Sequence, residues 1–400
     1  MKVLQINSVC GIRSTGRICT DIADILTQNG HECKIAYGRE TVPDEYKKYA
    51  VRIGSDLGVK IDALKSRIFD NAGFNSKRAT KKFIKWVEEY DPDVIHLHNI
   101  HGYYINVEIL FDYLKRSNKP VIWTLHDCWS FTGHCAHYTM ANCYKWRSEC
   151  SKCKRKKTYP KSFFLNRARI NFLAKKRVFT SVDNITIVTP SEWLANEVRQ
   201  SFLKKYSVLP IPNGIDLNLF KYTDSSFREE HNLQDKKIVL GVATAWEERK
   251  GLDKFVEISK ILPDEYKVVL VGLSSDQISR MPTNILALSA TDNVLDLCKI
   301  YSASDVFLNL GKEETMGLTT VEAMACGTPV VASNYTAVPE VVAPDGGIVI
   351  PDLKAETILS GINSVLSGDY LKTQNNAMLY EKNVQYNKYI ALYELIQRCV

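Results

Sequence analysis

The stretch LNLGKEETMGLTTVEAMACGTPVVAS, residues 308–333, decides how this chain is interpreted. Its apolar start predicts the end of a strand, and the polar residues 311–317 predict a loop. Thr319 suits an N-cap, Val321–Cys326 a compact helix, and Gly327 the stop of that helix before a second apolar strand. Open α/β sheets bind ligands where a helix begins beyond the carboxyl end of a strand, and its free N–H groups favour a phosphate. The stretch therefore predicts an anion-binding site.

Two glutamates of this stretch, Glu314 in the loop and Glu322 in the helix, are eight positions apart. One interpretation is structural, because Thr319-x-x-Glu322 is also the pattern of a capping box, in which Glu322 only satisfies backbone donors. The wider pattern favours another interpretation. The Glu-x7-Glu spacing followed by AMACGTPVVAS resembles the nucleotide-sugar site of the retaining glycosyltransferase family 4, whose members have the GT-B fold.

The resemblance implies a role for each residue of the motif. Glu314 matches the glutamate that contacts the donor sugar, and Glu322 matches the one that binds the ribose hydroxyls. By the same resemblance, the backbone N–H groups near Met316, Gly317 and Leu318 would contact phosphate or sugar oxygens. The implied ligand is a nucleotide-diphosphate sugar, either a UDP- or a GDP-sugar.

A second motif supplies positive charge for the leaving diphosphate, which needs cations or backbone N–H groups. Arg249-Lys250-Gly251 lies between a predicted strand and a predicted helix, and Lys250 matches the lysine of the family's Lys-Gly motif. The family often carries an arginine five residues earlier, where this chain has Ala245, so Arg249 is the candidate replacement. The alternative is two solvated cations at a helix start, where the dipole slightly disfavours them.

Three features of the N-terminal half are candidates for the site: one for the reacting sugar, one for the acceptor side, and one, a glycine loop, whose backbone could approach the donor diphosphate. His126 follows the predicted strand VIWTL and matches the histidine that the family places near the reacting sugar. His96 and His98 end another strand and are weaker candidates for lining the acceptor site. The loop from Gly11 to Gly16 resembles the family's first glycine loop, although it departs from G-x-G-x-x-G and lacks the ending of a P-loop.

Strand and helix patterns alternate in two series, the second starting at Lys237, which predicts an α/β protein of the GT-B type with two Rossmann-like domains facing each other across a cleft. The turn-rich segment 210–216 predicts the connection between them. We expect an N-terminal acceptor-binding domain over 1–212, a Cys-rich basic insertion within it at about 128–179, a C-terminal nucleotide-sugar-binding domain over 213–385, and a closing helix over 386–400 that returns to the N-terminal domain.

The insertion contains four cysteines in the spacing C-x7-C-x6-C-x2-C: Cys135, Cys143, Cys150 and Cys153. Four thiolates would complete a structural zinc tetrahedron, for which Cys150-x-x-Cys153 is a good half-site. Disulfides and free thiols are the alternatives that the spacing leaves open. The flanking sequence HDCWSFTGHCAHY resembles family 4 enzymes of bacterial surface-polysaccharide clusters, which also carry cysteines here.

Positive charge is concentrated in the same insertion. Residues 145–177 hold thirteen Lys or Arg and one acid, whereas the whole chain has a net charge of +7. Such a segment suits an anionic surface. The sequence SFFLNRARINFLAKKRVF, residues 162–179, has basic and aromatic residues at helical spacing, so it could rest on an anionic membrane or pack its aromatic side on the core.

Composition adds exclusions. No apolar run approaches the ~18 residues of a spanning helix, and the first residues have no signal-peptide pattern. Eleven cysteines, several in apolar settings, fit a reducing cytosol better than a secreted disulfide scaffold. No Asp-x-Asp stands where a metal site is expected, so we expect transfer without a catalytic metal.

These features together predict a cytoplasmic, peripherally membrane-associated retaining glycosyltransferase of bacterial surface-polysaccharide biosynthesis, by resemblance. Its acceptor would be a glycan or a lipid-linked oligosaccharide. Rival interpretations are another GT-B enzyme, such as a nucleotide-sugar epimerase or a phosphorylase, and a zinc-knuckle protein that binds nucleic acid. The basic run covers little of the chain, so nucleic acid is not the expected partner.

Overall fold

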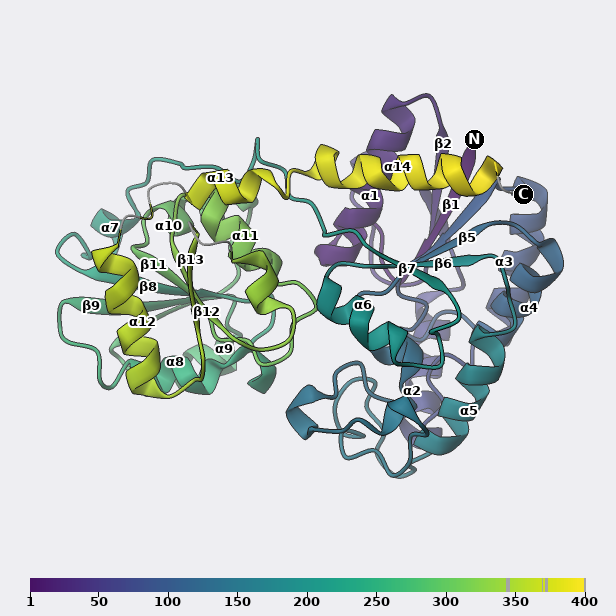
Figure 1. Ribbon diagram of the computed structural model, residues 1–400, viewed down its shortest axis with the longest axis horizontal. Helices are drawn as coiled ribbons and strands as arrows, with labels where there is room; N and C mark the ends of the chain where they lie inside the picture. Colours follow the sequence, from purple (N-terminus) through teal and green to yellow (C-terminus); the bar gives the residue numbers. More distant parts are fainter. Residues whose placement is uncertain (343–345, 369, 371–372, 399–400) are drawn as a thin grey trace. The chain divides into compact units, whose positions relative to one another are not determined.

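The computed structural model divides into two compact units. The N-terminal unit holds Met1–Pro212 together with Gln385–Val400, and the C-terminal unit holds Asn213–Val384. Each unit is built on one parallel sheet with helices packed against it (Figure 1), which confirms the predicted α/β class. The structure describes residues 1–342, 346–368, 370 and 373–398.

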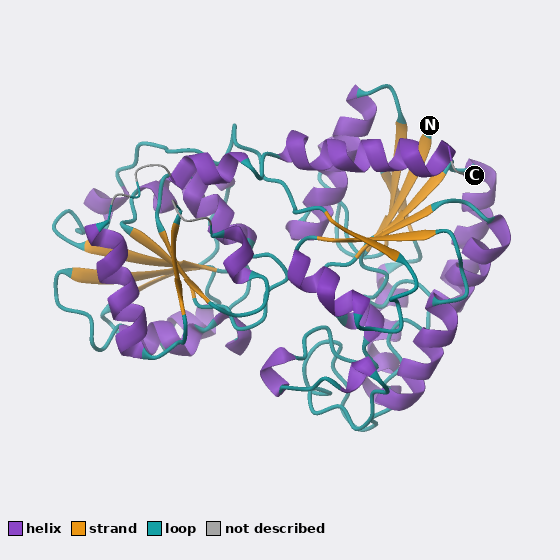
Figure 2. Ribbon diagram, viewed as in Figure 1, coloured by secondary structure: helices purple, strands orange, loops and turns teal. Residues whose placement is uncertain are grey.

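Seven strands form the sheet of the N-terminal unit, in the order β3-β2-β1-β4-β5-β6-β7. Figure 2 shows the strands of each unit with helices beside them. The strands are β1 (Lys2–Asn7), β2 (Glu32–Tyr37), β3 (Ala50–Arg52), β4 (Val94–Leu97), β5 (Val121–Thr124), β6 (Ile185–Thr189) and β7 (Ser207–Pro210). The helices are α1 (Arg13–Gln28), α2 (Asp56–Phe69), α3 (Lys77–Tyr90), α4 (Val107–Ser117), α5 (Ala168–Phe179), α6 (Glu192–Arg199) and α14 (Lys382–Arg398). Strands β4 and β5 are buried at every residue, as a parallel sheet covered on both faces requires.

The first glycine loop is shorter than predicted. We expected a loop from Gly11 to Gly16, but α1 begins at Arg13, so Gly16 lies in the first turn of the helix. The Gly11 N–H donates to the Gly16 carbonyl at 3.1 Å, and a Cβ on Gly16 would lie 3.1 Å from the Val9 side chain. Gly16 therefore lets the helix start pack tightly against the preceding turn.

The closing helix α14 starts earlier than expected, at Lys382 rather than at residue 386, and positions 399 and 400 of the expected helix lie outside the described residues. Its tyrosines pack on the N-terminal sheet. The Tyr393 hydroxyl lies 2.6 Å from Nδ1 of His96, and the Tyr389 hydroxyl lies 3.1 Å from the Thr124 hydroxyl.

Residues 125–167, between β5 and α5, form an insertion without a strand or an α-helix. They contain the 3₁₀ turns η2 (Trp129–Phe131), η3 (Thr139–Ala141) and η4 (Lys145–Arg147). The insertion owes its fixed shape to aromatic side chains that are at most 1% exposed: Trp129, Phe131, Tyr138 and Trp146. Burial of several large rings compensates for the missing regular structure.

The predicted amphipathic helix of residues 162–179 is only partly helical. Helix α5 begins at Ala168, and its Phe172 and Phe179 are buried in the core. These two rings therefore follow the core-packing alternative. The preceding Phe163, Phe164 and Leu165 lie outside the helix and are exposed by 44%, 72% and 44%.

Six strands form the sheet of the C-terminal unit, in the order β10-β9-β8-β11-β12-β13. The strands are β8 (Lys237–Val242), β9 (Tyr266–Val271), β10 (Ile285–Leu288), β11 (Val306–Asn309), β12 (Val330–Ser333) and β13 (Gly347–Ile350). The helices are α7 (Phe227–Glu230), α8 (Leu252–Ile258), α9 (Ser275–Ile278), α10 (Val294–Ser302), α11 (Leu318–Ala325), α12 (Ala355–Ser367) and α13 (Thr373–Met378). Strand β11 lies inside the sheet, so the loop after it leaves the middle of the carboxyl edge.

Candidate functional site

Helix α11 begins directly after the 311–317 loop, earlier than predicted. Gly317 is its N-cap and has a left-handed backbone with φ +92°, whereas Thr319 lies within the helix. No side chain caps α11, so the capping box of Thr319 and Glu322 does not form. The structural explanation for Glu322 is therefore wrong. Glycine at position 317 allows the chain to turn into the helix without a side-chain cap.

Polar side chains brace the 311–317 loop from both neighbouring strands. Asn309, the last residue of β11, accepts from the Gly311 N–H at 3.1 Å and donates to the Thr320 hydroxyl at 2.8 Å. Ser333, the last residue of β12, donates to the Gly311 carbonyl at 2.6 Å. A Cβ on Gly317 would lie 3.0 Å from the Asn309 amide nitrogen, so this glycine also permits the close approach. The brace presents the first N–H groups of α11 in a fixed position.

Lys250 and Glu314, both predicted site residues, form an ion pair. Their side chains are only 19% and 11% exposed. Lys250 ends the 3₁₀ turn η5 (Glu248–Lys250), and Gly251 follows with φ +75°. A Cβ on Gly251 would lie 2.4 Å from the Leu310 carbonyl oxygen. Only glycine allows the loop after β8 to lie against the loop after β11, and this contact brings the lysine to the glutamate.

Arg249 reaches the same loop. Its Nε lies 2.9 Å from the Glu247 carboxylate, and its Nη1 donates to the Glu313 carbonyl at 3.3 Å. The Lys312 N–H donates back to the Arg249 carbonyl at 2.8 Å. The guanidinium therefore lies beside Lys250 and links the two loops.

Glu322 is positioned by a residue that the sequence did not single out. The hydroxyl of Tyr301, in α10, donates to Oε2 of Glu322 at 3.1 Å. Tyr301 is wholly buried, and burial first and the Glu322 carboxylate second raise the pKa of its hydroxyl well above the usual value. It therefore remains a donor, and it fixes one oxygen of the carboxylate. A tyrosine at the end of a helix is too common a pattern to reveal this role.

In the N-terminal unit, His126 lies two residues beyond the end of β5 and stacks on His98 with the ring centroids 5.4 Å apart. Nε2 of His126 lies 3.1 Å from Nδ1 of His98, whose Nε2 lies 3.0 Å from Oε1 of Gln5. The Gln5 amide nitrogen donates to the Cys19 carbonyl at 2.8 Å, so its oxygen is the acceptor. Because Gln5 Oε1 must accept, Nε2 of His98 carries the proton and Nδ1 of His98 is an acceptor. Nε2 of His126, which faces that acceptor, therefore carries the proton of His126.

Burial keeps both rings neutral. It lowers the pKa of His126 to about 4 and that of His98 well below the usual value. At neutral pH, His126 therefore carries one proton on Nε2, directed at His98, and its Nδ1 is the acceptor nitrogen. His98 acts through His126 rather than lining a site, since it is only 2% exposed.

His96 does not line a site either. It is wholly buried, between the Tyr393 hydroxyl and the Thr124 hydroxyl, the latter 2.8 Å from its Nε2. Its suggested place on the acceptor side is therefore wrong, because its strand faces α14 at that position. Gly11 has φ +73°, and a Cβ there would lie 2.6 Å from the Tyr46 ring, so its backbone lies in a confined turn.

A sequence model described as "Glycosyltransferase Family 4" matches residues 15–219, more than half of the chain. The chain belongs to glycosyltransferase family 4. A second model, "Glycosyl transferases group 1", matches residues 224–384. Family 4 comprises retaining, metal-independent enzymes that use nucleotide sugars, so the transferase interpretation is confirmed and the nucleic-acid interpretation is wrong.

Individual relatives agree with this assignment. The putative colanic acid biosynthesis glycosyl transferase WcaC of Escherichia coli is 21% identical over 364 residues, 88% of each chain. The processive diacylglycerol alpha-glucosyltransferase of Acholeplasma laidlawii is 27% identical over 36% of this chain and 47% of its own.

Among solved structures, sucrose-phosphate synthase from Thermosynechococcus elongatus has a TM-score of 0.74 at 17% identity and covers both chains completely. Anabaena HepE in complex with UDP and glucose has a TM-score of 0.67 at 15% identity over 98% of each chain. These likenesses confirm the predicted GT-B fold.

The cysteines of the insertion do gather around one small cavity of about 20 Å³, together with His134. The predicted zinc site is nevertheless not supported, since the described residues contain no group of three or more His, Cys, Asp or Glu side chains arranged to hold a metal ion. The Cys135 and Cys153 thiols are hydrogen-bonded to each other, and the hydrogen bond from Cys135 lowers the pKa of Cys153 to about 6. Cys135, Cys143, Cys150 and Cys153 are all free thiols.

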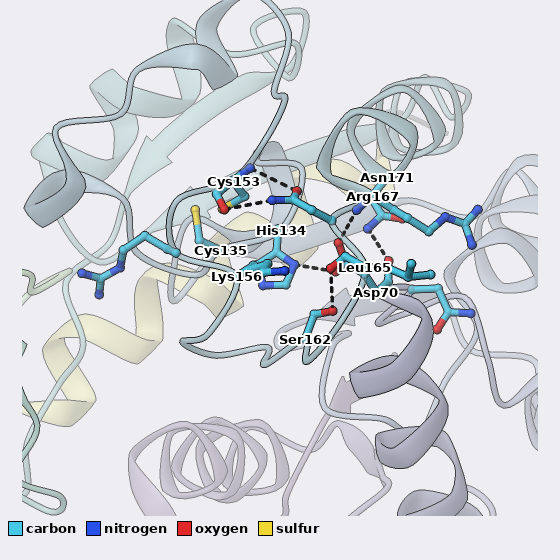
Figure 3. A network of polar contacts seen from close by, with 12 residues as sticks. Asp70, His134, Cys135, Cys153, Lys156, Ser162, Leu165, Arg167 and Asn171 are labelled. Atoms are coloured by element: carbon cyan, nitrogen blue, oxygen red, sulfur yellow. Dashed lines mark hydrogen bonds and ion pairs between the residues drawn. The ribbon is translucent and has the colours of Figure 1, made fainter.

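The insertion is instead fastened by a carboxylate. Figure 3 shows Asp70, the residue that ends α2, between His134 and Arg167 of the insertion. Asp70 lies 2.5 Å from Nδ1 of His134 and accepts from the Arg167 N–H at 2.5 Å. The histidine that could have joined the cysteines therefore binds this carboxylate. Within the described ranges, no helix is both long and apolar enough to cross a bilayer.

Proposed function

We propose that this family 4 enzyme transfers a sugar from a UDP- or GDP-sugar to a glycan or lipid-linked oligosaccharide in bacterial surface-polysaccharide biosynthesis. The observation that carries the donor half of the proposal is the pairing of Lys250 with Glu314 beside the uncapped start of α11. A lysine at a helix start is disfavoured by the dipole unless an anion joins it.

In this proposal the donor diphosphate replaces Glu314 as the ion-pair partner of Lys250. The diphosphate carries more charge than one carboxylate, and the N–H groups at Met316, Gly317 and Leu318 would donate to its oxygens. Freed from the lysine, Glu314 can accept hydrogen bonds from the hydroxyls of the donor sugar. The ion pair thus keeps both groups placed and charged before substrate arrives.

Glu322 would accept both ribose hydroxyls, with Tyr301 holding its carboxylate in the required orientation. Charge-assisted hydrogen bonds of this kind contribute about 1.5–3 kcal/mol each. Arg249, which lies beside Lys250, would take the place of the family arginine missing at Ala245, and the turn at Gly11 would let backbone approach the diphosphate.

His126 would serve as a neutral acceptor for a hydroxyl of the reacting sugar. Its proton lies on Nε2, directed at His98, so Nδ1 is the nitrogen with an acceptor lone pair. With retention of configuration, the leaving phosphate takes the proton of the acceptor hydroxyl on the face from which it departs. His126 then positions the sugar and is not required to change its protonation state.

The acceptor and pathway rest on relatives. The Escherichia coli relative is described as a colanic acid biosynthesis enzyme and spans 88% of this chain. The Acholeplasma relative glucosylates a lipid, diacylglycerol. The first supports a polysaccharide pathway and the second a lipid acceptor, and we propose that this enzyme works at the cytoplasmic face of a membrane.

A binding screen tests the donor site. Calorimetry and thermal shift with UDP, GDP and their sugar conjugates are run on the wild type, Lys250→Ala and Glu322→Ala. UDP comes first because Anabaena HepE was solved with it. We expect one nucleotide to stabilise the wild type and to lose at least tenfold in affinity in both variants.

Lys260→Ala and Glu356→Ala are matched controls, because both side chains are exposed and lie outside the motifs. Equal nucleotide binding by all five proteins would show that the motif residues do not bind the donor. Binding without sugar transfer to a lipid-linked acceptor would leave the donor site standing and refute the proposed acceptor.

A further inference from the structure

A cavity of about 950 Å³ lies in the N-terminal unit between α2, α3 and the end of β3. None of the predicted site residues lines this cavity. Because the strands of this sheet are all parallel, the cavity at the end of β3 opens at the same sheet edge as His126 at the end of β5. This edge is where α/β sheets bind ligands, so the cavity is placed for a ligand of its own.

The lining of the cavity combines apolar and basic side chains. The apolar ones come from α3 and from the segments after β3 and before α3: Ile53, Phe74, Phe83 and Trp86. Five lining residues are basic: Arg52, Lys65, Lys77, Arg78 and Lys82. A ligand that satisfies both kinds of side chain must combine an anionic group with hydrocarbon.

The one acid in the lining does not neutralise these cations. Asp62 is only 2% exposed, and its carboxylate accepts from Ser66 at 3.0 Å, from Asn75 at 3.1 Å and from the Ser76 hydroxyl. Among the cations, Arg52 pairs with Asp56. Throughout the described part of the chain, no carboxylate lies within 4.0 Å of the charged nitrogens of Lys65, Lys77, Arg78 or Lys82. Four cations are therefore available to an anion.

The start of α3 adds to the positive potential. Ser76 is its N-cap, but no side chain caps the helix, because the Ser76 hydroxyl is taken by Asp62. The first turn carries Lys77 and Arg78 and no acid. This basic helix start is unfavourable by itself and becomes favourable when a phosphate joins it.

Helix α2 presents apolar side chains to solvent beside the cavity. Leu57, Ile61 and Leu64, spaced four and three residues apart, are exposed by 68%, 46% and 55%. Ile61 also lines the cavity. Side chains at this spacing share one face of a helix, so α2 has an exposed apolar stripe next to a basic cavity.

A second exposed apolar group lies at the other end of α2. The Phe163 N–H donates to the Arg67 carbonyl at 2.8 Å, which brings the exposed Phe163, Phe164 and Leu165 next to the last turn of the helix. The surrounding insertion segment 145–177 carries thirteen basic residues and one acid. Exposed apolar side chains flanked by lysine and arginine are the pattern of a surface that enters the headgroup region of an anionic bilayer.

We propose that the α2–α3 cavity binds the phosphate-bearing headgroup of an anionic lipid, with the α2 stripe and residues 163–165 in the bilayer interface. The basic lining residues and the start of α3 hold the phosphate, and the apolar lining residues contact the first part of the acyl chains. This assigns a binding site to the membrane association of the proposed function, but it depends on none of the donor-site residues.

Vesicle sedimentation of the full chain tests the proposal. The vesicles contain phosphatidylcholine alone or with 30% phosphatidylglycerol, and no nucleotide is present. We expect binding to the anionic vesicles and at least tenfold weaker binding to the neutral ones. The variant Lys77→Ser/Arg78→Ser/Lys82→Ser should weaken binding at least tenfold, as should Leu57→Ser/Leu64→Ser.

The matched control is Lys115→Ser/Lys204→Ser/Lys260→Ser, which removes three exposed lysines elsewhere and should change binding less than threefold. Equal losses in the control and cavity variants would reduce the effect to net charge and overturn the site. Wild-type binding by Leu57→Ser/Leu64→Ser would overturn the apolar insertion. Nucleotide affinity, measured on the same variants, should be unchanged and reports folding.

Soluble probes separate a lipid from a free phosphate. Calorimetry compares short-chain dihexanoyl phosphatidylglycerol below its micelle concentration with glycerol 3-phosphate. We expect the lipid to bind at least tenfold more tightly, because only the lipid has hydrocarbon that contacts the apolar lining residues. Equal affinities would show a plain phosphate site and refute a lipid site, whereas loss of donor binding alone would affect only the proposed function.

Discussion

The 311–317 loop of the C-terminal unit and the insertion of residues 125–167 differ in how far along the chain their supporting contacts reach. Asn309 and Ser333 hold the loop through partners 11 and 22 residues away. Asp70 holds the insertion through partners 64 and 97 residues away. The loop is therefore specified mainly by its own stretch of sequence, whereas the insertion is specified by another element. This difference explains why the Glu-x7-Glu motif of the loop could be interpreted from sequence, whereas the cysteines of the insertion wrongly predicted a zinc site.

The largest effect should follow from breaking the ion pair that links the loop to Lys250. Lys250→Ala removes the cation proposed for the leaving diphosphate, and loss of one such group costs about 10³-fold in kcat/KM. It also leaves Glu314 without its partner in a mostly buried position, at about 2–3 kcal/mol of stability. Steady-state kinetics and denaturant unfolding measure the two effects.

The double variant Lys250→Ala/Glu314→Gln separates these effects. Removing the carboxylate charge that Lys250 no longer balances should restore most of the lost stability and none of the activity. Activity within tenfold of the wild type in Lys250→Ala would show that the loop has no need of this cation, and the loop would then be supported by local contacts alone.

The next effect concerns the glycine that lets the two loops meet. Gly251→Ala combines φ +75° with a Cβ 2.4 Å from the Leu310 carbonyl oxygen, so we expect a loss of about 3 kcal/mol in the C-terminal unit. Gly30→Ala is the matched control, since Gly30 has φ +76° but no atom within 4 Å of its added Cβ. It should cost about 1 kcal/mol.

Hydrogen exchange, measured separately for each unit, reports the loss of stability in both glycine variants. Equal losses of stability in the two variants would mean that backbone strain alone accounts for the effect of Gly251→Ala. The loop at Leu310 would then shift to accommodate the added Cβ without a loss of free energy. The loop would then be less tightly specified than its polar brace suggests.

The same contrast governs what the sequence could predict. The two alternating series of strands and helices were predicted, and the second series does begin at Lys237, the first residue of β8, because apolar periodicity is a local signal. The Glu-x7-Glu loop and the Lys-Gly motif were also interpretable locally. Tyr301 was missed because its role depends on where α10 packs against α11.

The insertion shows the limit more sharply. The C-x7-C-x6-C-x2-C spacing correctly brings the thiols around one cavity, but zinc also requires that their side chains converge. His134 is drawn to Asp70 of α2, and the Cys135 and Cys153 thiols bond to each other. A spacing pattern has no information about a carboxylate 64 residues away.

The buried amine of Lys175 makes the insertion sensitive to pH. Lys175 donates to the Trp129 carbonyl at 2.7 Å, and burial lowers its pKa to about 7. The unfolded chain has the ordinary value near 10.5, so between these values it binds more protons than the folded protein. Unfolding free energy should therefore rise with pH above 7, by up to about 1.4 kcal/mol per pH unit.

Denaturant unfolding at pH 7.0 and 8.5 checks this, with Lys175→Met as the reference. We expect the wild type to gain about 1–2 kcal/mol more than the variant across this interval. An equal gain in the wild type and the variant would mean that Lys175 stays protonated, held by its carbonyl acceptors. The insertion would then be fastened by a buried charge and not by a neutral hydrogen-bond donor.

The smallest effect tests whether the local motif is complete without Tyr301. Tyr301→Phe removes one hydrogen bond to Glu322, worth about 1–1.5 kcal/mol, so nucleotide affinity should fall about tenfold while the fold is kept. Tyr266→Phe is the control, because its hydroxyl bonds to Asn363 at an exposed position. If Tyr301→Phe binds nucleotide like the control, the orientation of Glu322 is set by its own helix. The orientation of Glu322 would then be encoded within residues 308–333, and the contrast with the insertion would be as large as the sequence suggests.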